Sequence, residues 1–386
     1  MLLKSKSSHT FGIGYDPRIR FGSRTIPRPK VVAQAASTYS GIYCRPNIDN
    51  GGTIPASGTL CTCPDIWISG TQPLANFQTA LATDSSYATA SGDGIQQGQP
   101  NYIYVRARNG ASQPLSTQVQ LFALPCGVIQ WPAKWGQYSI PTDIEYQPPN
   151  PPVYISNINN LAAAATGVAQ NAFIWSDPET PPPGSDHYCL ITWMNNASNP
   201  FPNTFGQLDI SNLILNDLGY GWRNVSLQSG SSPTVQMVTQ LDIPVNTPAG
   251  SRQYYIIVIP SGFPNGWQVS MSCSQTDAKG NVIAIPQQNL PTQQGLFLGV
   301  YAWLDPGFSA TLTFNLYQNG AGPANNASLQ VQAQYQSAPH ELKRALALGV
   351  VDFVTSRALQ SAFRGFGLGP TAACPLGSDN VTLKRP

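Results

Sequence analysis

The clearest strand pattern of the sequence is Asn101-Tyr102-Ile103-Tyr104-Val105-Arg106-Ala107-Arg108-Asn109-Gly110. Aromatic and basic residues occupy its even positions from 102 to 108, whereas Ile103, Val105 and Ala107 occupy the odd ones. Because successive side chains of a β-strand point to opposite faces, this alternation predicts a strand with one apolar face. Asn109-Gly110 favours a turn that tolerates positive φ. The alternating residues 117–123 then predict a partner strand for residues 101–109.

The composition extends the β prediction to the whole chain. Only 10% of the residues are charged, against about 25% in an ordinary soluble domain. The chain also contains 34 glycines and 35 prolines, which break long helices and place turns between short strands. Further apolar or alternating runs lie at residues 65–68, 187–194, 222–227, 254–259, 267–271, 299–303 and 310–317. The sequence therefore predicts an all-β protein of tandem β-sandwiches.

Five segments are predicted along the chain. Residues 1–40 form a basic extended arm, and residues 41–147 form the first sandwich, which the resemblance described below implies to be immunoglobulin-like. The proline-rich stretch at residues 147–152 predicts a stiff linker, so residues 148–232 form a second sandwich and residues 233–336 a third. Residues 337–386 form a C-terminal helix and tail, in which the helix begins near Pro339 and ends before Gly365.

The charges are distributed unevenly. Residues 1–30 carry a net charge of +6, residues 31–338 a net charge of −7, and residues 339–386 a net charge of +3. A basic arm can bind nucleic acid, an anionic surface or the acidic body of another copy, although a solvated tail explains it as well. The tail helix is apolar around much of its circumference, which predicts a covered surface. The predicted interaction residues are Lys4, Lys6, Arg18, Arg20, Arg24, Arg28 and Lys30 in the arm, with Leu342, Leu346, Phe353 and Phe363 in the helix.

The sequence offers few signals of location. No apolar signal segment follows Met1-Leu2-Leu3-Lys4, and no stretch approaches the length of a membrane span. We therefore expect cytoplasmic synthesis followed by incorporation into, or release with, a particle. There are seven cysteines, and a bond from Cys44 to Cys61 or Cys63 is possible but not determined by the sequence.

The chain is poor in the groups that enzymes use. His340-Glu341-Leu342-Lys343-Arg344 begins like the zinc motif H-E-x-x-H, but Arg344 replaces the second histidine. His187 and Cys189 fall on one face of a strand, where a core cysteine beside a hydrogen-bonded histidine is the favoured interpretation. Cys61 and Cys63 are too closely spaced for a zinc knuckle. We therefore predict no enzyme, no cofactor, and no catalytic, cofactor-binding or metal-binding residue.

Aromatic residues offer more candidates for binding than the ionisable residues do. The tryptophans could stack on sugars or anchor an interface, although most tryptophans of small sandwiches belong to the core. They lie at Trp67, Trp131, Trp135, Trp175, Trp193, Trp222, Trp267 and Trp303.

Part of the chain resembles a known family. Residues 63–68 (CPDIWI), 98–110 (GQPNYIYVRARNG), 119–123 (VQLFA) and 131–132 (WP) are similar to CARDB-like immunoglobulin-type accessory sandwiches of bacterial surface proteins and secreted peptidases. Residues 187–191 (HYCLI) and 222–225 (WRNV) resemble the module that often follows. The resemblance covers about residues 60–230. It implies an immunoglobulin-like fold with an accessory or interaction role and no catalytic residues.

These observations predict a non-enzymatic structural or interaction subunit of a larger bacterial or phage-like assembly. The partners would be further copies of the chain or other subunits, joined through the basic arm, the acidic body and the tail helix. An alternative is an adhesin or glycan-binding module that uses exposed aromatic side chains. A third is an effector with an unrecognised activity in residues 233–386.

Overall fold

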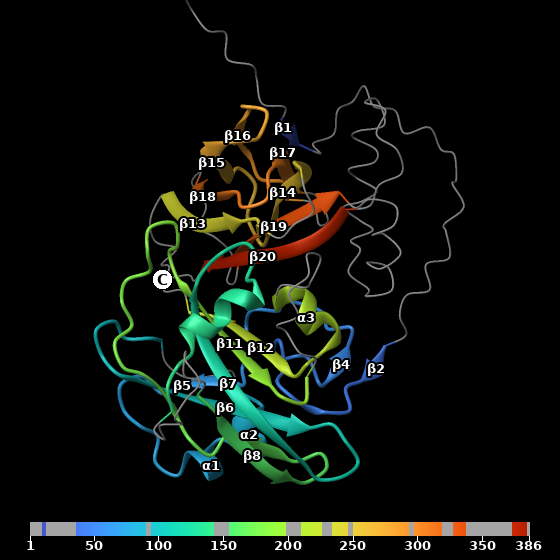
Figure 1. The fold of residues 1–386 in the computed structure, drawn as a ribbon, viewed down its shortest axis with the longest axis vertical. Helices are drawn as coiled ribbons and strands as arrows, with labels where there is room; N and C mark the ends of the chain where they lie inside the picture. The colour runs from blue at the N-terminus through green and yellow to red at the C-terminus, as the bar shows by residue number, and fades with distance from the viewer. Residues whose placement is uncertain are drawn as a thin grey trace, which may run out of the picture. The chain divides into compact units, whose positions relative to one another are not determined.

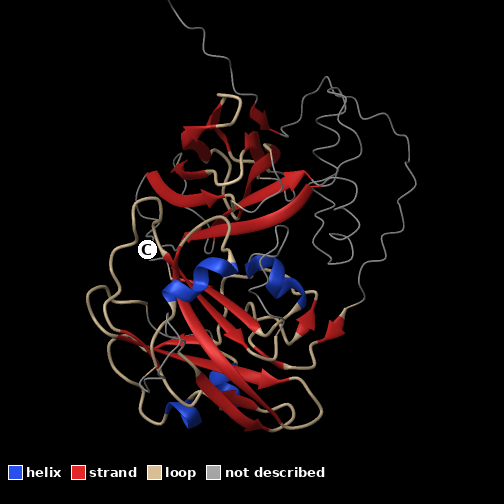
Figure 2. Ribbon diagram, viewed as in Figure 1, coloured by secondary structure: helices blue, strands red, loops and turns tan. Residues whose placement is uncertain are grey.

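A computed structural model gives the fold of the chain, which consists mostly of strands (Figures 1 and 2). It describes residues 10–12, 36–89, 94–142, 154–197, 210–225, 234–245, 250–292, 297–318, 327–336 and 373–383. The chain divides into two compact units. We name them the central unit, Ser37–Leu227, and the terminal unit, which combines Met1–Ala36 with Gln228–Pro386.

The first sheet of the central unit is built around β6 (Asn101–Asn109), the strand predicted most clearly from the sequence. Four short antiparallel strands pair with it. They are β3 (Ile42–Tyr43), β5 (Ile66–Ile68), β9 (Thr166–Val168) and β10 (Phe173–Trp175).

The second sheet of the central unit has the order β12-β11-β7-β8. Its strands are β7 (Leu115–Pro125), β8 (Ser156–Leu161), β11 (Tyr188–Met194) and β12 (Tyr220–Asn224). A small ladder joins β2 (Ser37–Thr38) to β4 (Thr53–Ile54). The helical elements are α1 (Phe77–Ala80), α2 (Asp84–Tyr87), the 3₁₀ helix η1 (Pro132–Tyr138) and α3 (Ile210–Asn216).

The main core of the central unit contains the apolar face predicted for residues 101–109. Ile103, Val105 and Ala107 of β6 belong to one buried cluster with Val119 and Leu121 of β7. The opposite face of β6 is covered too, because Tyr104 packs in a small cluster with Leu81. The other side of β7 and β11 forms a third cluster, to which η1 and α3 contribute. Buried alternating residues on both sheets are the signature of a β-sandwich.

One predicted pairing is wrong. Residues 117–123 lie in β7, but β7 pairs with β11 and β8 in the second sheet and not with β6. Gly110 follows β6 without the positive φ that a tight hairpin would require. Glycine is needed here because the backbone of Tyr39 approaches closely: a Cβ added to Gly110 would lie 2.1 Å from the carbonyl oxygen of Tyr39. The chain therefore crosses from one sheet to the other after β6.

The predicted boundary between the first two sandwiches is also wrong. β7, from the range 41–147, pairs along most of its length with β11, from the range 148–232. β9 and β10, from the second range, pair with β6 of the first. The two predicted domains therefore form one compact unit.

The terminal unit contains two antiparallel sheets, in the orders β1-β17-β14-β19-β20 and β13-β18-β15-β16. The first comprises β1 (Thr10–Gly12), β14 (Arg252–Ser261), β17 (Leu298–Leu304), β19 (Ala327–Gln336) and β20 (Ala373–Leu383). The second comprises β13 (Thr234–Asp242), β15 (Gln268–Thr276), β16 (Val282–Asn289) and β18 (Ser309–Tyr317). In β18, buried Leu312, Phe314 and Leu316 alternate with half-buried polar residues, as predicted for residues 310–317.

The predicted third sandwich, residues 233–336, is incomplete without its neighbours in sequence. β20 lies in the segment predicted as helix and tail, and it pairs with the whole of β19. This strand was not predicted, because the sequence 375–380 (PLGSDN) is typical of turns. β1 lies in the predicted basic arm and pairs with β17. The predicted tail helix lies outside the described residues.

None of the helices in the described ranges is long and apolar enough to cross a membrane.

Candidate functional site

The predicted interaction residues are not placed by the structure. The basic side chains of the arm, from Lys4 to Lys30, and the apolar side chains of the tail helix, from Leu342 to Phe363, lie outside the described residues. Both sets remain predictions.

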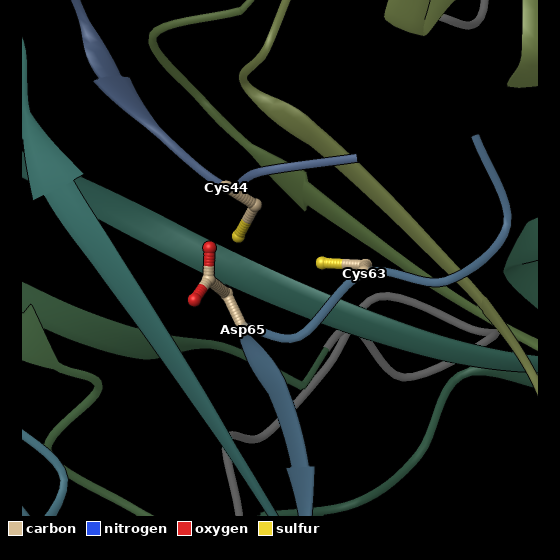
Figure 3. A group of neighbouring side chains, drawn as sticks. All are labelled: Cys44, Cys63 and Asp65. Carbon is tan, nitrogen blue, oxygen red and sulfur yellow. The ribbon is translucent and has the colours of Figure 1, made fainter. Parts of the chain in front are cut away.

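A buried group of two cysteines and a carboxylate lies in the central unit. Cys44, Cys63 and Asp65 are 0% exposed, and their Sγ and carboxylate atoms lie within 4.8 Å of one another (Figure 3). Cys44 follows β3, whereas Cys63 and Asp65 precede β5. Thiolates and carboxylates are zinc ligands, so this group has the residue types of a metal site.

The hydrogen bonds of Asp65 argue against a metal. Its Oδ2 accepts hydrogen bonds from the backbone N–H of Arg45 at 2.7 Å and from Arg45 Nε at 3.1 Å. Its Oδ1 accepts from Arg45 Nη2 at 2.7 Å and from Arg106 Nε at 3.0 Å. Both oxygens are thus committed to arginines. Two thiols alone do not complete the four-coordinate site of structural zinc.

The arginines around Asp65 are themselves held in place. Arg106 donates further hydrogen bonds to the carbonyl oxygens of Pro64, Ser86 and Thr89. The Arg45 guanidinium lies 3.5 Å from the centre of the Tyr87 ring, a cation–π geometry. Burial alone would lower the pKa of Arg45, but the hydrogen bond and the charge of Asp65 outweigh burial and raise it. We interpret Asp65, Arg45 and Arg106 as a structural ion network.

The His187–Cys189 pair also has structural partners. The Nδ1 atom of His187 lies 2.6 Å from Oδ1 of Asp186. The Cys189 thiol donates to Oδ1 of Asn224 at 3.3 Å and accepts from Nε2 of Gln130 at 3.6 Å. Both residues are buried. This matches the favoured interpretation of a core cysteine beside a hydrogen-bonded histidine.

The strongest candidate for a ligand site is a pocket of about 290 Å³ in the central unit. We name it the aromatic pocket. Its wall includes the half-buried rings of Tyr138, Trp175 and Tyr188, and the exposed carboxylates of Asp177 and Glu179 lie at its edge. Its remaining lining residues are Ala123, Gln137, Ser139, Ile140 and Pro141.

Three different elements position the rings of the aromatic pocket. Tyr138 ends η1, Trp175 ends β10 and Tyr188 begins β11. The rings of Trp175 and Tyr188 meet edge to face, with centroids 4.9 Å apart and planes at 86°. Burial raises the pKa of Tyr188, and the charges of Glu179 and Tyr138 add to the shift. The pocket therefore combines an ordered apolar wall with carboxylate acceptors.

A second pocket, of about 440 Å³, lies in the loop between β3 and β5. We name it the loop pocket. Its lining is mostly polar: Asn47, Ile48, Asp49, Asn50, Ser57, Gly58, Thr59 and Thr62. The Asn47 amide bridges the loop by donating to the carbonyl oxygens of Ser57 and Thr59. These residues supply many hydrogen-bonding groups but no aromatic wall.

Sequence reasoning found only part of the aromatic pocket. Trp175 is among the tryptophans that the sequence analysis names as possible binding residues. Tyr138, Glu179 and Tyr188 were missed, because the pocket forms only when η1, β10 and β11 come together. Of the other tryptophans, Trp131, Trp135, Trp222 and Trp267 are buried core residues.

No family model matches the chain, and no curated protein matches it at a significant level. Among solved structures, a red sea bream transglutaminase matches 65% of this chain at 7% identity with a TM-score of 0.18. The secreted serine protease VesC of Vibrio cholerae matches 63% at 9% identity with a TM-score of 0.17. The collagen adhesin of S. aureus matches 62% at 10% identity with a TM-score of 0.16.

The matched part spans 30% of the transglutaminase and 48% of VesC, and 83% of the adhesin structure. Similarity at this level does not assign the chain to a family. The resemblance of residues 60–230 to CARDB-like modules therefore stays a prediction.

Proposed function

We propose that this chain is a non-enzymatic binding protein whose central unit holds a saccharide ring in the aromatic pocket. The observation that carries the proposal is the convergence of Tyr138, Trp175 and Tyr188 with two carboxylates in one concave site. A sugar ring has an apolar face of C–H groups and an edge of hydroxyl groups. The aromatic rings of the pocket can pack against the C–H face of the sugar. Asp177 and Glu179 can accept hydrogen bonds from its hydroxyl groups.

The size of the aromatic pocket supports a small occupant. Its volume of about 290 Å³ lies just below the range for small-molecule sites, roughly 300–1,000 Å³. This suits one ring of a longer glycan better than an extended segment. The CARDB-like resemblance, with its implied accessory role, agrees with a module that binds without transforming its ligand.

A hydrolytic function is less well supported. Glycoside hydrolysis uses two carboxyl groups, one of which is kept protonated by its surroundings so that it can act as an acid. Asp177 and Glu179 are both exposed to solvent. Neither carboxylate is enclosed in an apolar environment.

The test is a glycan array followed by calorimetry with the best glycan. We expect Trp175→Ala to weaken binding about 30-fold or more, because a central aromatic anchor contributes about 2 kcal/mol. Trp303→Ala is the matched control: Trp303 is also half-buried but lies in the terminal unit, under the ammonium group of Lys279. A blank array at high protein concentration, or unchanged binding by Trp175→Ala, would contradict the proposal.

A second candidate function, assembly, is favoured by β1. Thr10–Gly12 of the basic arm pairs with the outer side of β17, so the arm can complete a sheet edge by main-chain hydrogen bonds. The same contact made between copies would join them. The net charge of +6 in residues 1–30 and −7 in residues 31–338 would also favour association of arm and body.

Light scattering after size-exclusion chromatography tests this second candidate. We expect the full chain to form oligomers, a deletion of residues 1–9 to retain them through β1, and a deletion of residues 1–36 to give monomers. The deletion stops at residue 36 because β2 and Tyr39 belong to the central unit. A full chain that is monomeric at all protein concentrations and salt concentrations would exclude assembly of this chain with itself.

A further inference from the structure

The two cysteines of the buried group are arranged for a bond with each other. Cys44 and Cys63 both carry free thiols and are 0% exposed. Their side chains and that of Asp65 point into one space (Figure 3), with the two Sγ atoms within 4.8 Å of each other. Nineteen positions separate them in the sequence, so this proximity is a property of the fold.

The backbone anchors both cysteines to one neighbouring segment, which consists of β12 and the turn that precedes it. The N–H of Cys44 donates to the carbonyl oxygen of Leu218, and the N–H of Cys63 donates to that of Trp222. Gly221 lies between these anchors. A Cβ added there would lie 3.0 Å from Sγ of Cys63 and 3.2 Å from Cβ of Cys44. The two side chains are thus closely packed against this strand.

The other partners considered for Cys44 do not fit. Cys61 belongs to the cluster of Phe122 and Trp135, whereas Cys44 and Cys63 share the main core cluster. Asp65 cannot complete a metal site with the thiols, because four hydrogen bonds from two arginines occupy its oxygens. Of the alternatives left open by the sequence, the geometry selects Cys63.

We propose that Cys44 and Cys63 form a disulfide when the chain folds in the presence of a small-molecule disulfide. In the first step a cysteine thiolate attacks the oxidant, forms a mixed disulfide and releases one small thiol. The second cysteine thiolate then displaces the other small thiol and closes the protein disulfide. Two protein thiols are oxidised, and one molecule of the small disulfide is reduced to two thiols.

Burial determines when this reaction can occur. The thiolate is the reacting species. Burial, reinforced by the neighbouring Cys63, raises the pKa of Cys44 well above its ordinary value in the folded chain. An oxidant also has no path to residues that are 0% exposed. The bond therefore forms before the core closes, and the folded chain then retains whichever state it acquired.

The disulfide would close the loop that carries the loop pocket. Every residue that lines this pocket lies between Cys44 and Cys63. The bridge would restrain both ends of the loop in the unfolded chain and in any local opening. The oxidation state at folding would therefore set the stability of the central unit and the rigidity of the loop pocket.

The experiment refolds the reduced, denatured full chain with a mixture of oxidised and reduced glutathione, and in parallel with reduced glutathione alone. Cleavage before Asp49 and Asp65 separates Cys44 from the fragment that carries Cys61 and Cys63. We expect the two fragments to be joined only after oxidative refolding. We also expect the Tm of the oxidised chain to lie about 6–12 °C above that of the reduced chain.

Three variants assign the bond. Cys61→Ala should retain the difference in Tm between oxidative and reductive refolding, whereas Cys44→Ala and Cys63→Ala should lose it. Each variant is compared with the same variant refolded under the other condition, so any effect of the substitution on packing cancels. Free thiols at Cys44 and Cys63 after oxidative refolding of the unmodified chain would overturn the proposal, as would a bond from Cys44 to Cys61. The fragment masses show whether Cys44 is joined to residues 49–64, and tandem mass spectrometry of the linked pair, with backbone cleavage between Cys61 and Cys63, assigns the partner even if a variant does not fold.

Discussion

Asp65→Ala is expected to lower the free energy of unfolding of the central unit by about 3–5 kcal/mol. The carboxylate is 0% exposed and accepts four hydrogen bonds from Arg45 and Arg106, which are themselves 5% and 0% exposed. Removing it leaves two buried guanidinium groups without their counter-ion. Because domains are stable by only about 5–15 kcal/mol, the variant should be close to unfolding. Urea denaturation followed by tryptophan fluorescence measures the loss.

Asp49→Ala is the matched control for this prediction. Asp49 is exposed in the turn between β3 and β4, so its loss should change the free energy of unfolding by no more than about 0.5 kcal/mol. Asp65→Asn keeps the shape of the side chain and removes the charge. Its free energy of unfolding should lie between those of Asp65→Ala and Asp49→Ala. Equal stabilities for Asp65→Ala and Asp49→Ala would show that the ion network does not stabilise the fold.

The sequence predicts faces of strands better than it predicts their partners. The alternation in residues 101–109 correctly placed Ile103, Val105 and Ala107 in the core, because side-chain direction is a local property of a strand. The partner of residues 117–123 was wrong, because the pairing of β7 with β11 joins segments about seventy residues apart. No local pattern records which of several apolar strands will meet.

The predicted boundary between the first two domains was wrong for a related reason. A proline-rich stretch predicts a segment without regular structure, and such a segment can connect two strands of one sandwich as well as two domains. Here β7 precedes residues 147–152 and its partners β8 and β11 follow them. β20 was missed because Pro375 and Gly377 resemble turn residues, although pairing with β19 overrides that preference.

Candidate sites were predictable only as residue types. The sequence placed Arg106 on the polar face of its strand, but it could not reveal that Asp65 neutralises this arginine inside the protein. It likewise identified Cys44 and two possible partners without choosing between them. The aromatic pocket draws on η1, β10 and β11, so only the fold brings Tyr138 to Trp175 and Tyr188. Chemistry that depends on such convergence is not recorded in local patterns.

The same argument separates tryptophans that build the core from those available to ligands. Trp135 is 0% exposed, and its ring centroid lies 5.7 Å from that of Phe122 and 6.3 Å from that of Tyr220. It thereby joins η1 to strands β7 and β12 of the second sheet. Trp175, in contrast, is half-buried in the wall of the aromatic pocket. The two residues should respond differently to truncation.

We therefore expect Trp135→Ala to lower the free energy of unfolding by about 3–5 kcal/mol, since it removes a fully buried aromatic side chain and leaves a cavity. Its neighbour Gly136 provides the control. A Cβ added there meets nothing within 4 Å, so Gly136→Ala should change stability by no more than about 0.5 kcal/mol. Urea denaturation of both variants measures the difference. If Trp135→Ala were as stable as Gly136→Ala, η1 would not be packed on the second sheet, and the wall that Tyr138 contributes to the aromatic pocket would lose its support.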